Sequence, residues 1–164
     1  MREIVEKYSI LFADDHTLLR QGIISLVRNF EFIDTDLIQQ AANGLEAVNN
    51  VKRNQPDLVV MDVSMPEMNG LEATQLIKNQ FPEIKVLILS HYNNEPYVLR
   101  ALKAGADGYM LKDAAVEELY KGLQSLINEK MYISPDIDQN IVERLTKSGA
   151  GEIDALDILT SRQR

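Results

Sequence analysis

The chain has 164 residues, which is enough for one domain of ordinary size and too few for two full ones. Its 45% hydrophobic and 26% charged residues match a soluble globular protein and exclude a disordered, collagen-like or coiled-coil chain. The 17 basic and 25 acidic residues give a formal net charge of −8, so the sequence lacks the positive surface that binding to nucleic-acid phosphates requires.

The chain contains no cysteine, which excludes disulfide scaffolds, thiolate metal sites and cysteine nucleophiles. Residues 1–8 mix both charges and lack the apolar run of a signal peptide. No apolar run approaches the ~20 residues of a membrane-spanning helix. These features predict a cytoplasmic protein that makes no membrane contact.

Five short apolar runs, each bounded by polar or turn residues, predict five buried strands. They span residues 9–13, 36–41, 58–61, 85–89 and 108–111. Apolar residues at helical spacing follow each run. They are Leu19, Ile23, Leu26, Val27 and Phe30 after the first strand, residues 45–51 after the second, Leu71, Leu76 and Ile77 after the third, residues 96–104 after the fourth, and Val116, Leu119, Tyr120, Leu123, Leu126 and Ile127 after the fifth.

This fivefold alternation of strand and helix predicts an α/β fold, with a doubly wound, five-stranded parallel sheet covered by helices on both faces. In such a sheet, ligands bind at the carboxyl ends of the strands, where the strand order reverses. The sequence therefore predicts a functional site at that edge.

Four of the five predicted strands stop at polar or charged residues, namely Asp14 and Asp15, Asp62, Ser90, and Lys112. Three carboxylates that converge on one edge repel one another unless a cation lies among them. Oxygen ligands without a His or Cys cluster favour Mg²⁺ that retains several waters. A nearby lysine and hydroxyl suit a phosphoryl group, because they offset its charge and donate hydrogen bonds.

Together these residues resemble a bacterial response-regulator receiver domain. The resemblance covers residues 7–128 and depends on the acid pair 14–15, the run 62–70, Ser90, and the run 108–112, in that order. It implies a flavodoxin-like (βα)5 receiver fold and a phosphorylation-dependent switch of a two-component system.

The resemblance implies a role for each acidic position. Asp62 would be the phosphoacceptor, taking a phosphoryl group from the phosphohistidine of a sensor histidine kinase. Asp15 would bind Mg²⁺ directly and Asp14 mainly through waters, while Asp62 and the backbone carbonyl of Ser64 would complete the protein's ligands.

The same resemblance assigns the remaining site residues. Lys112 would neutralise phosphoryl charge, and Ser90 would hydrogen-bond the phosphoryl group while Tyr109 rotates inward behind it. A protein of this kind catalyses only its own phosphorylation and dephosphorylation, is not otherwise an enzyme, and forms a homodimer on phosphorylation.

Two positions depart from the family pattern. Asp113 stands where many members have proline after the lysine, so we expect a trans bond there and an aspartate free to cap the fifth helix. Ser90 replaces the more common threonine and keeps the hydroxyl.

Some of these residues allow other interpretations. His16 is expected to be a surface histidine entering the first helix rather than a metal ligand. A haloacid-dehalogenase-type aspartyl-phosphate hydrolase also uses a strand-end aspartate, Mg²⁺ and lysine, but it needs a second acid two residues after the nucleophile, where this chain has Ser64. A receiver used only as a docking module is the other alternative, and it is disfavoured because every chemical position is filled.

The C-terminal residues suggest a linker and the start of another domain. Ser134 and Pro135 predict the start of a short amphipathic helix, which ends before a flexible hinge at residues 149–151. Residues 159–164 resemble the opening of the helix-turn-helix domain in NarL/LuxR-type transcriptional regulators. We therefore expect a receiver at residues 7–130, a linker at 131–158, and a DNA-binding domain truncated at 159–164, so that DNA would be bound only through the missing part.

Overall fold

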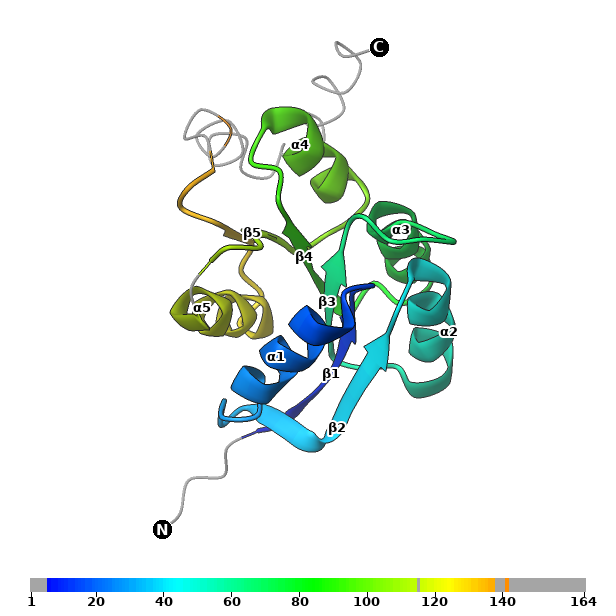
Figure 1. Cartoon of the computed structure of the whole chain (residues 1–164), viewed down its shortest axis with the longest axis vertical. Coiled ribbons are helices and arrows are strands. Elements are labelled where there is room, and N and C mark those ends of the chain that lie inside the picture. The colour runs from blue at the N-terminus through cyan, green and yellow to red at the C-terminus, as the bar shows by residue number, and fades with distance from the viewer. Residues whose placement is uncertain (1–5, 115, 138–140, 142–164) are drawn as a thin grey trace.

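The structure is a computed structural model that describes residues 6–114, 116–137 and 141. Strands and helices alternate along the described chain (Figure 1). The strands are β1 (Tyr8–Ala13), β2 (Ile33–Ala41), β3 (Leu58–Asp62), β4 (Lys85–Ser90), β5 (Gly108–Leu111) and β6 (Tyr132–Ile133). The helices are α1 (Thr17–Val27), α2 (Gly44–Asn54), α3 (Gly70–Gln80), α4 (Glu95–Lys103) and α5 (Val116–Ile127).

All strands of the sheet are parallel, in the order β2-β1-β3-β4-β5-β6. The order reverses between β1 and β3, because the chain moves outward to β2 and then returns past β1. This confirms the predicted doubly wound (βα)5 fold and places the reversal point between the strands that carry Asp14 and Asp62.

Each face of the sheet is covered by its own set of helices. Helices α1 and α5 lie on one face and α2, α3 and α4 on the other (Figure 1). Successive strand residues therefore alternate between two buried clusters, as in β3, where Val59 belongs to one cluster and Val60 to the other. Burial on both faces explains why the strands are continuous apolar runs in the sequence.

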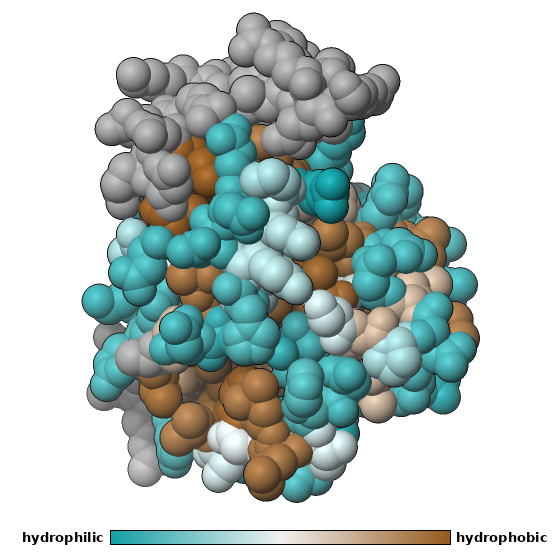
Figure 2. Space-filling model, turned by 45° about the horizontal axis from the view of Figure 1, so that its top comes forward, coloured by the Kyte–Doolittle hydropathy of each residue, from teal (hydrophilic) through white to brown (hydrophobic). Residues whose placement is uncertain are grey.

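The structure adds to the predicted elements in one place and corrects one helical face. Strand β6 pairs in parallel with β5 and was not predicted, because two residues are too short to show a period. Helix α1 forms as predicted, but its buried residues are Ile24 and Val27, while Leu19 and Leu26 are 40% and 43% exposed. The visible surface in Figure 2 is mostly hydrophilic with separate apolar patches.

Several smaller expectations can also be compared with the structure. No cis peptide bond occurs among the described residues, so the Lys112–Asp113 bond is trans as predicted. Residues 135–137, where the predicted linker helix should begin, form a turn and a bend rather than a helix, and Ile141 is helical. The rest of the predicted linker helix and residues 159–164 lie outside the described residues. No helix in the described part of the chain is both long enough and apolar enough to span a membrane.

Candidate functional site

The two buried aspartates lie side by side at the carboxyl edge of the sheet. Ala13 pairs with Met61 across β1 and β3, so Asp14 and Asp62 each follow a paired residue at the point where the strand order reverses. Asp14 is 5% exposed and Asp62 3% exposed, whereas Asp15 turns into solvent. The sheet register thus brings together two aspartates that lie 48 residues apart in the sequence.

Lys112 lies directly opposite this pair. Its Nζ is 3.0 Å from Asp62 Oδ2 and 3.4 Å from Asp14 Oδ2, and its side chain is 3% exposed. The Lys112 backbone N–H donates to the Ser90 carbonyl across the ends of β4 and β5. One buried cation therefore faces two buried carboxylates.

The balance of charges leaves the site short of positive charge. Burial raises the pKa of the Asp62 carboxyl, the nearby Lys112 lowers it, and the charge of Asp14 raises it again, with a net upward shift. Neither Asp14 Oδ2 nor Asp62 Oδ2, both buried, has a hydrogen-bond partner of good geometry. A site with this imbalance favours a bound cation.

The predicted acids also form a cluster with metal-ligand spacing. Asp14, Asp15, His16 and Asp62 each offer one ligand atom, and these atoms lie within 4.8 Å of one another. The structure therefore brings together all three predicted carboxylates. Ser64 lies exposed in the loop after β3, and the role of its carbonyl stays a prediction.

The loop that follows Asp62 is shaped by a close backbone approach. A Cβ at Gly70 would lie 1.9 Å from the Asp62 carbonyl oxygen, so only glycine fits. Asn69 caps α3 by accepting from the Glu72 N–H, and Glu67 adopts a left-handed φ of 66° within the loop. The Asn69-Gly70 pair thus holds the start of α3 against the backbone of Asp62.

Ser90 and Tyr109 both hydrogen-bond to the backbone of Tyr92. The Tyr92 N–H donates to Ser90 Oγ at 3.0 Å, and the Tyr109 hydroxyl donates to the Tyr92 carbonyl at 2.6 Å. Ser90 is 1% exposed and Tyr109 is fully buried, and the inward rotation of Tyr109 on phosphorylation stays a prediction. Burial also raises the pKa of the Tyr109 phenol.

These residues fall within a region that matches a known protein family. The family profile of the response regulator receiver domain matches residues 10–124. The chain belongs to the response regulator receiver family.

Relatives of this receiver are transcriptional regulators. It is 36% identical over 140 residues to the oxygen regulatory protein NreC of Staphylococcus carnosus, and this match covers 85% of this chain and 64% of the relative. It is 33% identical over 159 residues to the nitrate/nitrite response regulator NarL of Escherichia coli K12, covering 97% and 73% respectively. The chain thus spans less than three quarters of either relative.

A solved structure agrees with this assignment. A LuxR-family two-component response regulator from Aurantimonas sp. SI85-9A1 superposes with a TM-score of 0.78 at 30% identity, covering 84% of this chain and 97% of that one. Together with the NarL and NreC relatives, it bears out the resemblance to NarL/LuxR-type regulators.

The sequence did not predict the contacts that three residues, His16, Arg20 and Tyr92, make at the receiver site. His16 is an exposed side chain as expected, but its Nδ1 lies 3.0 Å from Asp14 Oδ1 and 3.2 Å from Asp15 Oδ1. Arg20 donates hydrogen bonds to the Asp14 carbonyl and to Gln40 Oε1 on β2. Arg20 follows His16 by one helical turn, and this spacing was the only feature of the sequence that could have predicted its place at the site. No feature of the sequence indicates the role of the Tyr92 backbone.

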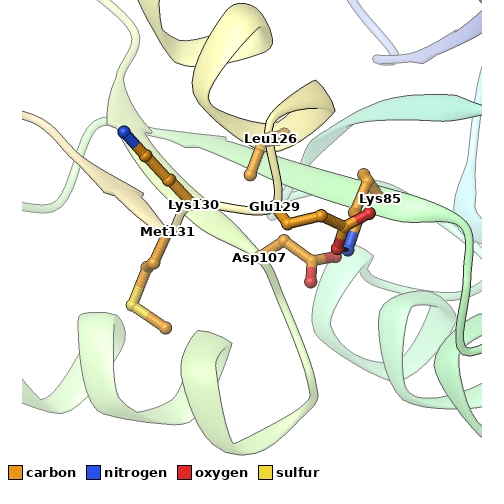
Figure 3. A pocket seen from close by; sticks show the side chains of 6 residues that line it. All are labelled: Lys85, Asp107, Leu126, Glu129, Lys130 and Met131. Atoms are coloured by element: carbon orange, nitrogen blue, oxygen red, sulfur yellow. Dashed lines mark hydrogen bonds and ion pairs between the residues drawn. The ribbon is translucent and has the colours of Figure 1, made fainter. Parts of the chain in front are cut away.

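A pocket of the receiver lies at the opposite edge of the sheet from the acidic cluster. A pocket of about 290 Å³ is lined by residues near the amino ends of β4 and β5 and after α5 (Figure 3). Its charges are largely paired, because Lys85 contacts Glu129 at 2.5 Å and Asp107 contacts Lys78 at 2.9 Å. The acidic edge, rather than this pocket, is the candidate site.

Proposed function

We propose that this chain is a phosphorylation-dependent switch in which Asp62 accepts a phosphoryl group from the phosphohistidine of a sensor histidine kinase. The observation that carries the proposal is the buried Asp62 Oδ2, which lies 3.0 Å from Lys112 Nζ within the acidic cluster. Response regulators of two-component systems are partners of such kinases, and the chain belongs to their family.

The residues of the cluster fit a bound Mg²⁺. The two buried carboxylate oxygens, Asp14 Oδ2 and Asp62 Oδ2, which share Lys112 as their cation, are the hard donors that this ion prefers. Asp15 would hold the ion directly and Asp14 mainly through water, with Asp62 and the Ser64 carbonyl completing the protein's share. When bound, Mg²⁺ supplies positive charge against the phosphoryl oxygens.

The chain's own residues account for the transfer step. A carboxylate oxygen of Asp62 attacks phosphorus, the bond from phosphorus to the donor's histidine nitrogen breaks, and an acyl phosphate forms. Lys112 is placed to neutralise phosphoryl charge, because its Nζ already lies beside the Asp62 carboxylate. Ser90, at the end of the neighbouring strand, supplies a hydroxyl to the transferred group.

The transferred group acts on the rest of the domain through charge. Phosphorylation adds roughly −1.5 to −2 charge at the sheet edge. The Ser90 hydroxyl leaves the Tyr92 N–H for the phosphoryl group, while Tyr109 remains inward on the Tyr92 carbonyl. The surface of α4, β5 and α5 repacks in response.

The output of the switch is transcriptional control in the cytoplasm. NreC and NarL are named as regulatory proteins, and this chain covers 64% and 73% of their lengths. We infer that the full-length protein forms a homodimer on phosphorylation and binds DNA through a C-terminal helix-turn-helix domain. The receiver itself catalyses only its own phosphorylation and dephosphorylation.

Two alternatives remain to be tested beside this one. An aspartyl-phosphate hydrolase needs an acid two residues after Asp62, and Ser64 stands there. A receiver that only docks a partner does not need a buried, cation-faced Asp62. Both alternatives predict that Asp62 does not hold a lasting phosphoryl group.

A small phosphodonor tests the proposal without a kinase. Acetyl phosphate with Mg²⁺ should add one hydroxylamine-labile phosphoryl group to the wild-type chain, and Asp62→Asn should abolish this labelling. Asp36→Asn is the matched control, because Asp36 is exposed on β2, and it should label like the wild type. Labelling that survives in Asp62→Asn would overturn the assignment.

A further inference from the structure

His16 follows the two acids at the end of β1. It is the N-cap residue of α1, with extended backbone angles (φ −90°, ψ 94°), yet its side chain makes no capping hydrogen bond with the helix. The imidazole turns back to the acids, where Nδ1 lies 3.0 Å from Asp14 Oδ1 and 3.2 Å from Asp15 Oδ1. The ring is therefore directed at the carboxylates rather than at the start of the helix.

Backbone and side-chain hydrogen bonds hold His16 in this position. Its N–H donates to Asp14 Oδ1 at 2.9 Å, and its carbonyl accepts from the Arg20 N–H at 2.9 Å in the first turn of α1. The Arg20 guanidinium donates to the Asp14 carbonyl and to Gln40 Oε1, which ties the same turn to the end of β2. The imidazole is therefore preorganised beside the acids, although 61% of its side chain is exposed.

The two side-chain oxygens of Asp14 face different partners. Oδ2 lies 3.4 Å from Lys112 Nζ, whereas Oδ1 lies beside the His16 ring. The four ligand atoms of the acidic cluster, one of which is His16 Nδ1, lie within 4.8 Å of one another. Because Lys112 occupies one side of the cluster, the side that remains for a metal ion is the one that His16 lines.

The spacing of these atoms suits ligands of one ion. Two ligand atoms that are each about 2.1 Å from an ion and at right angles lie about 3.0 Å apart, as adjacent ligands of an octahedral site do. The distances from His16 Nδ1 to the two carboxylate oxygens, 3.0 and 3.2 Å, match this spacing. A neutral ring carries one proton and can carry it on Nε2, which leaves the Nδ1 lone pair free for an ion. The same distances also suit hydrogen bonds from a protonated Nδ1 to the carboxylates, which is the alternative to be tested.

An imidazole ligand changes which metal a site prefers. Mg²⁺ is a hard ion that takes oxygen ligands, whereas divalent first-row transition ions accept imidazole nitrogen together with carboxylates. We propose that His16 Nδ1 is a metal ligand that joins the carboxylates of the cluster, so that the site binds a divalent first-row transition ion more tightly than Mg²⁺. The inference rests on the metal site of the proposed function. It differs from the sequence-based expectation, which placed His16 outside that site.

Pulsed electron paramagnetic resonance of the full chain with Mn²⁺ tests the proposal directly. A nitrogen atom bound to Mn²⁺ gives a nitrogen hyperfine coupling, and the wild type should show the coupling of one imidazole. This coupling should disappear in His16→Asn, whose amide keeps a hydrogen-bond donor near the position of Nδ1 but provides no imidazole. His91→Asn is the matched control and should keep the coupling, because His91 is the only other histidine of the chain and is exposed after β4.

Metal affinities give a second readout. Titration calorimetry should show that His16→Asn weakens Mn²⁺ binding by about tenfold or more, since even the loss of a group that only orients a ligand typically costs about 10–100-fold in metal affinity. Mg²⁺ binding should change by less than about twofold, because this ion takes oxygen ligands, and the preference for Mn²⁺ should fall in the variant. Equal losses for the two ions, or no loss for either, would mean that His16 only positions the acids and would overturn the proposal.

The ligand proposal and the proposed function can fail separately. If Mn²⁺ binds and acetyl phosphate labels Asp62, but the wild type shows no nitrogen coupling or His16→Asn keeps it, His16 is not a ligand and the proposed function stands. If neither Mn²⁺ nor Mg²⁺ binds the wild type, the ligand proposal fails, and the labelling of Asp62 decides whether the proposed function fails as well. The spectra of the wild type and His91→Asn decide the matter even if His16→Asn does not fold.

Discussion

Asp62 is a carboxylate that the fold buries beside another acid, Asp14, and, among the described residues, beside a single cation, Lys112. Burial is the largest cause of its raised pKa, and Lys112 offsets this only in part. A group in such a position is destabilising when ionised, which is typical of functional sites. The residue-scale predictions follow from this charge imbalance.

Replacing Asp62 should stabilise the metal-free protein at neutral pH. Below the ordinary pKa of 3.8, both the folded and unfolded forms of Asp62 carry the proton and the residue has no pH-dependent effect. As the pH rises, the unfolded chain loses the proton first, so the free energy of unfolding of the wild type falls until the folded carboxyl has also ionised. In Asp62→Asn the side chain does not ionise, so this fall in the free energy of unfolding does not occur.

Thermal unfolding without divalent metal should therefore give a higher midpoint for Asp62→Asn than for wild type at pH 7, and the difference should shrink toward pH 3. Asp36→Asn, an exposed acid, should show no such trend. A difference between Asp62→Asn and wild type that grows on acidification would contradict the raised pKa.

Removing Lys112 should destabilise the protein, in contrast to the replacement of Asp62. Lys112→Ala leaves Asp14 and Asp62 buried with no cation, a change that typically lowers the free energy of unfolding by about 3 kcal/mol. Millimolar Mg²⁺ should restore part of that loss, because it replaces the missing positive charge. Chemical denaturation checks this, with exposed Lys121→Ala as the control; a Lys112→Ala variant as stable as that control would count against the site geometry.

At the scale of elements, the loop between β3 and α3 fixes where the Asp62 backbone lies. Most elements were predictable, because strands buried on both faces show as apolar runs and the helices between them keep a 3.6-residue spacing. Strand β6 and the buried face of α1 were not. Two residues show no period, and the leucines of α1 fit a helical spacing whether or not they face the sheet.

Two glycines make a matched test of the β3–α3 loop. Gly70→Ala places a Cβ 1.9 Å from the Asp62 carbonyl oxygen, so backbone must move and the free energy of unfolding should fall by about 2 kcal/mol or more. Gly22→Ala in α1 meets nothing within 4 Å and should raise it by about 0.5–1 kcal/mol. Urea denaturation of both variants checks the pair, and similar stabilities would mean that the loop does not pack as described.

At the scale of the whole molecule, the sheet gathers Asp14, Asp62, Ser90 and Lys112 at the carboxyl ends of its strands. Asp14, Asp62, Ser90 and Lys112 were recognisable from the sequence because each ends an apolar run. The contacts of His16 and Arg20 and the bridge through Tyr92 were not, because they depend on where loops place side chains and backbone groups. The contacts of Ser134 were not predictable either, because Ser134 and Pro135 are typical of a helix start, whereas the Ser134 hydroxyl hydrogen-bonds both β5 and α5.

The central claim is that Asp62 carries the phosphoryl group. Treating the chain with acetyl phosphate and Mg²⁺, reducing the product with borohydride and sequencing its peptides by mass spectrometry would locate the acyl phosphate directly. We predict that the reduced residue is Asp62, converted to homoserine, with none at Asp14 or Asp15. Reduction at another acid, or at none while phosphate is retained, would contradict the account.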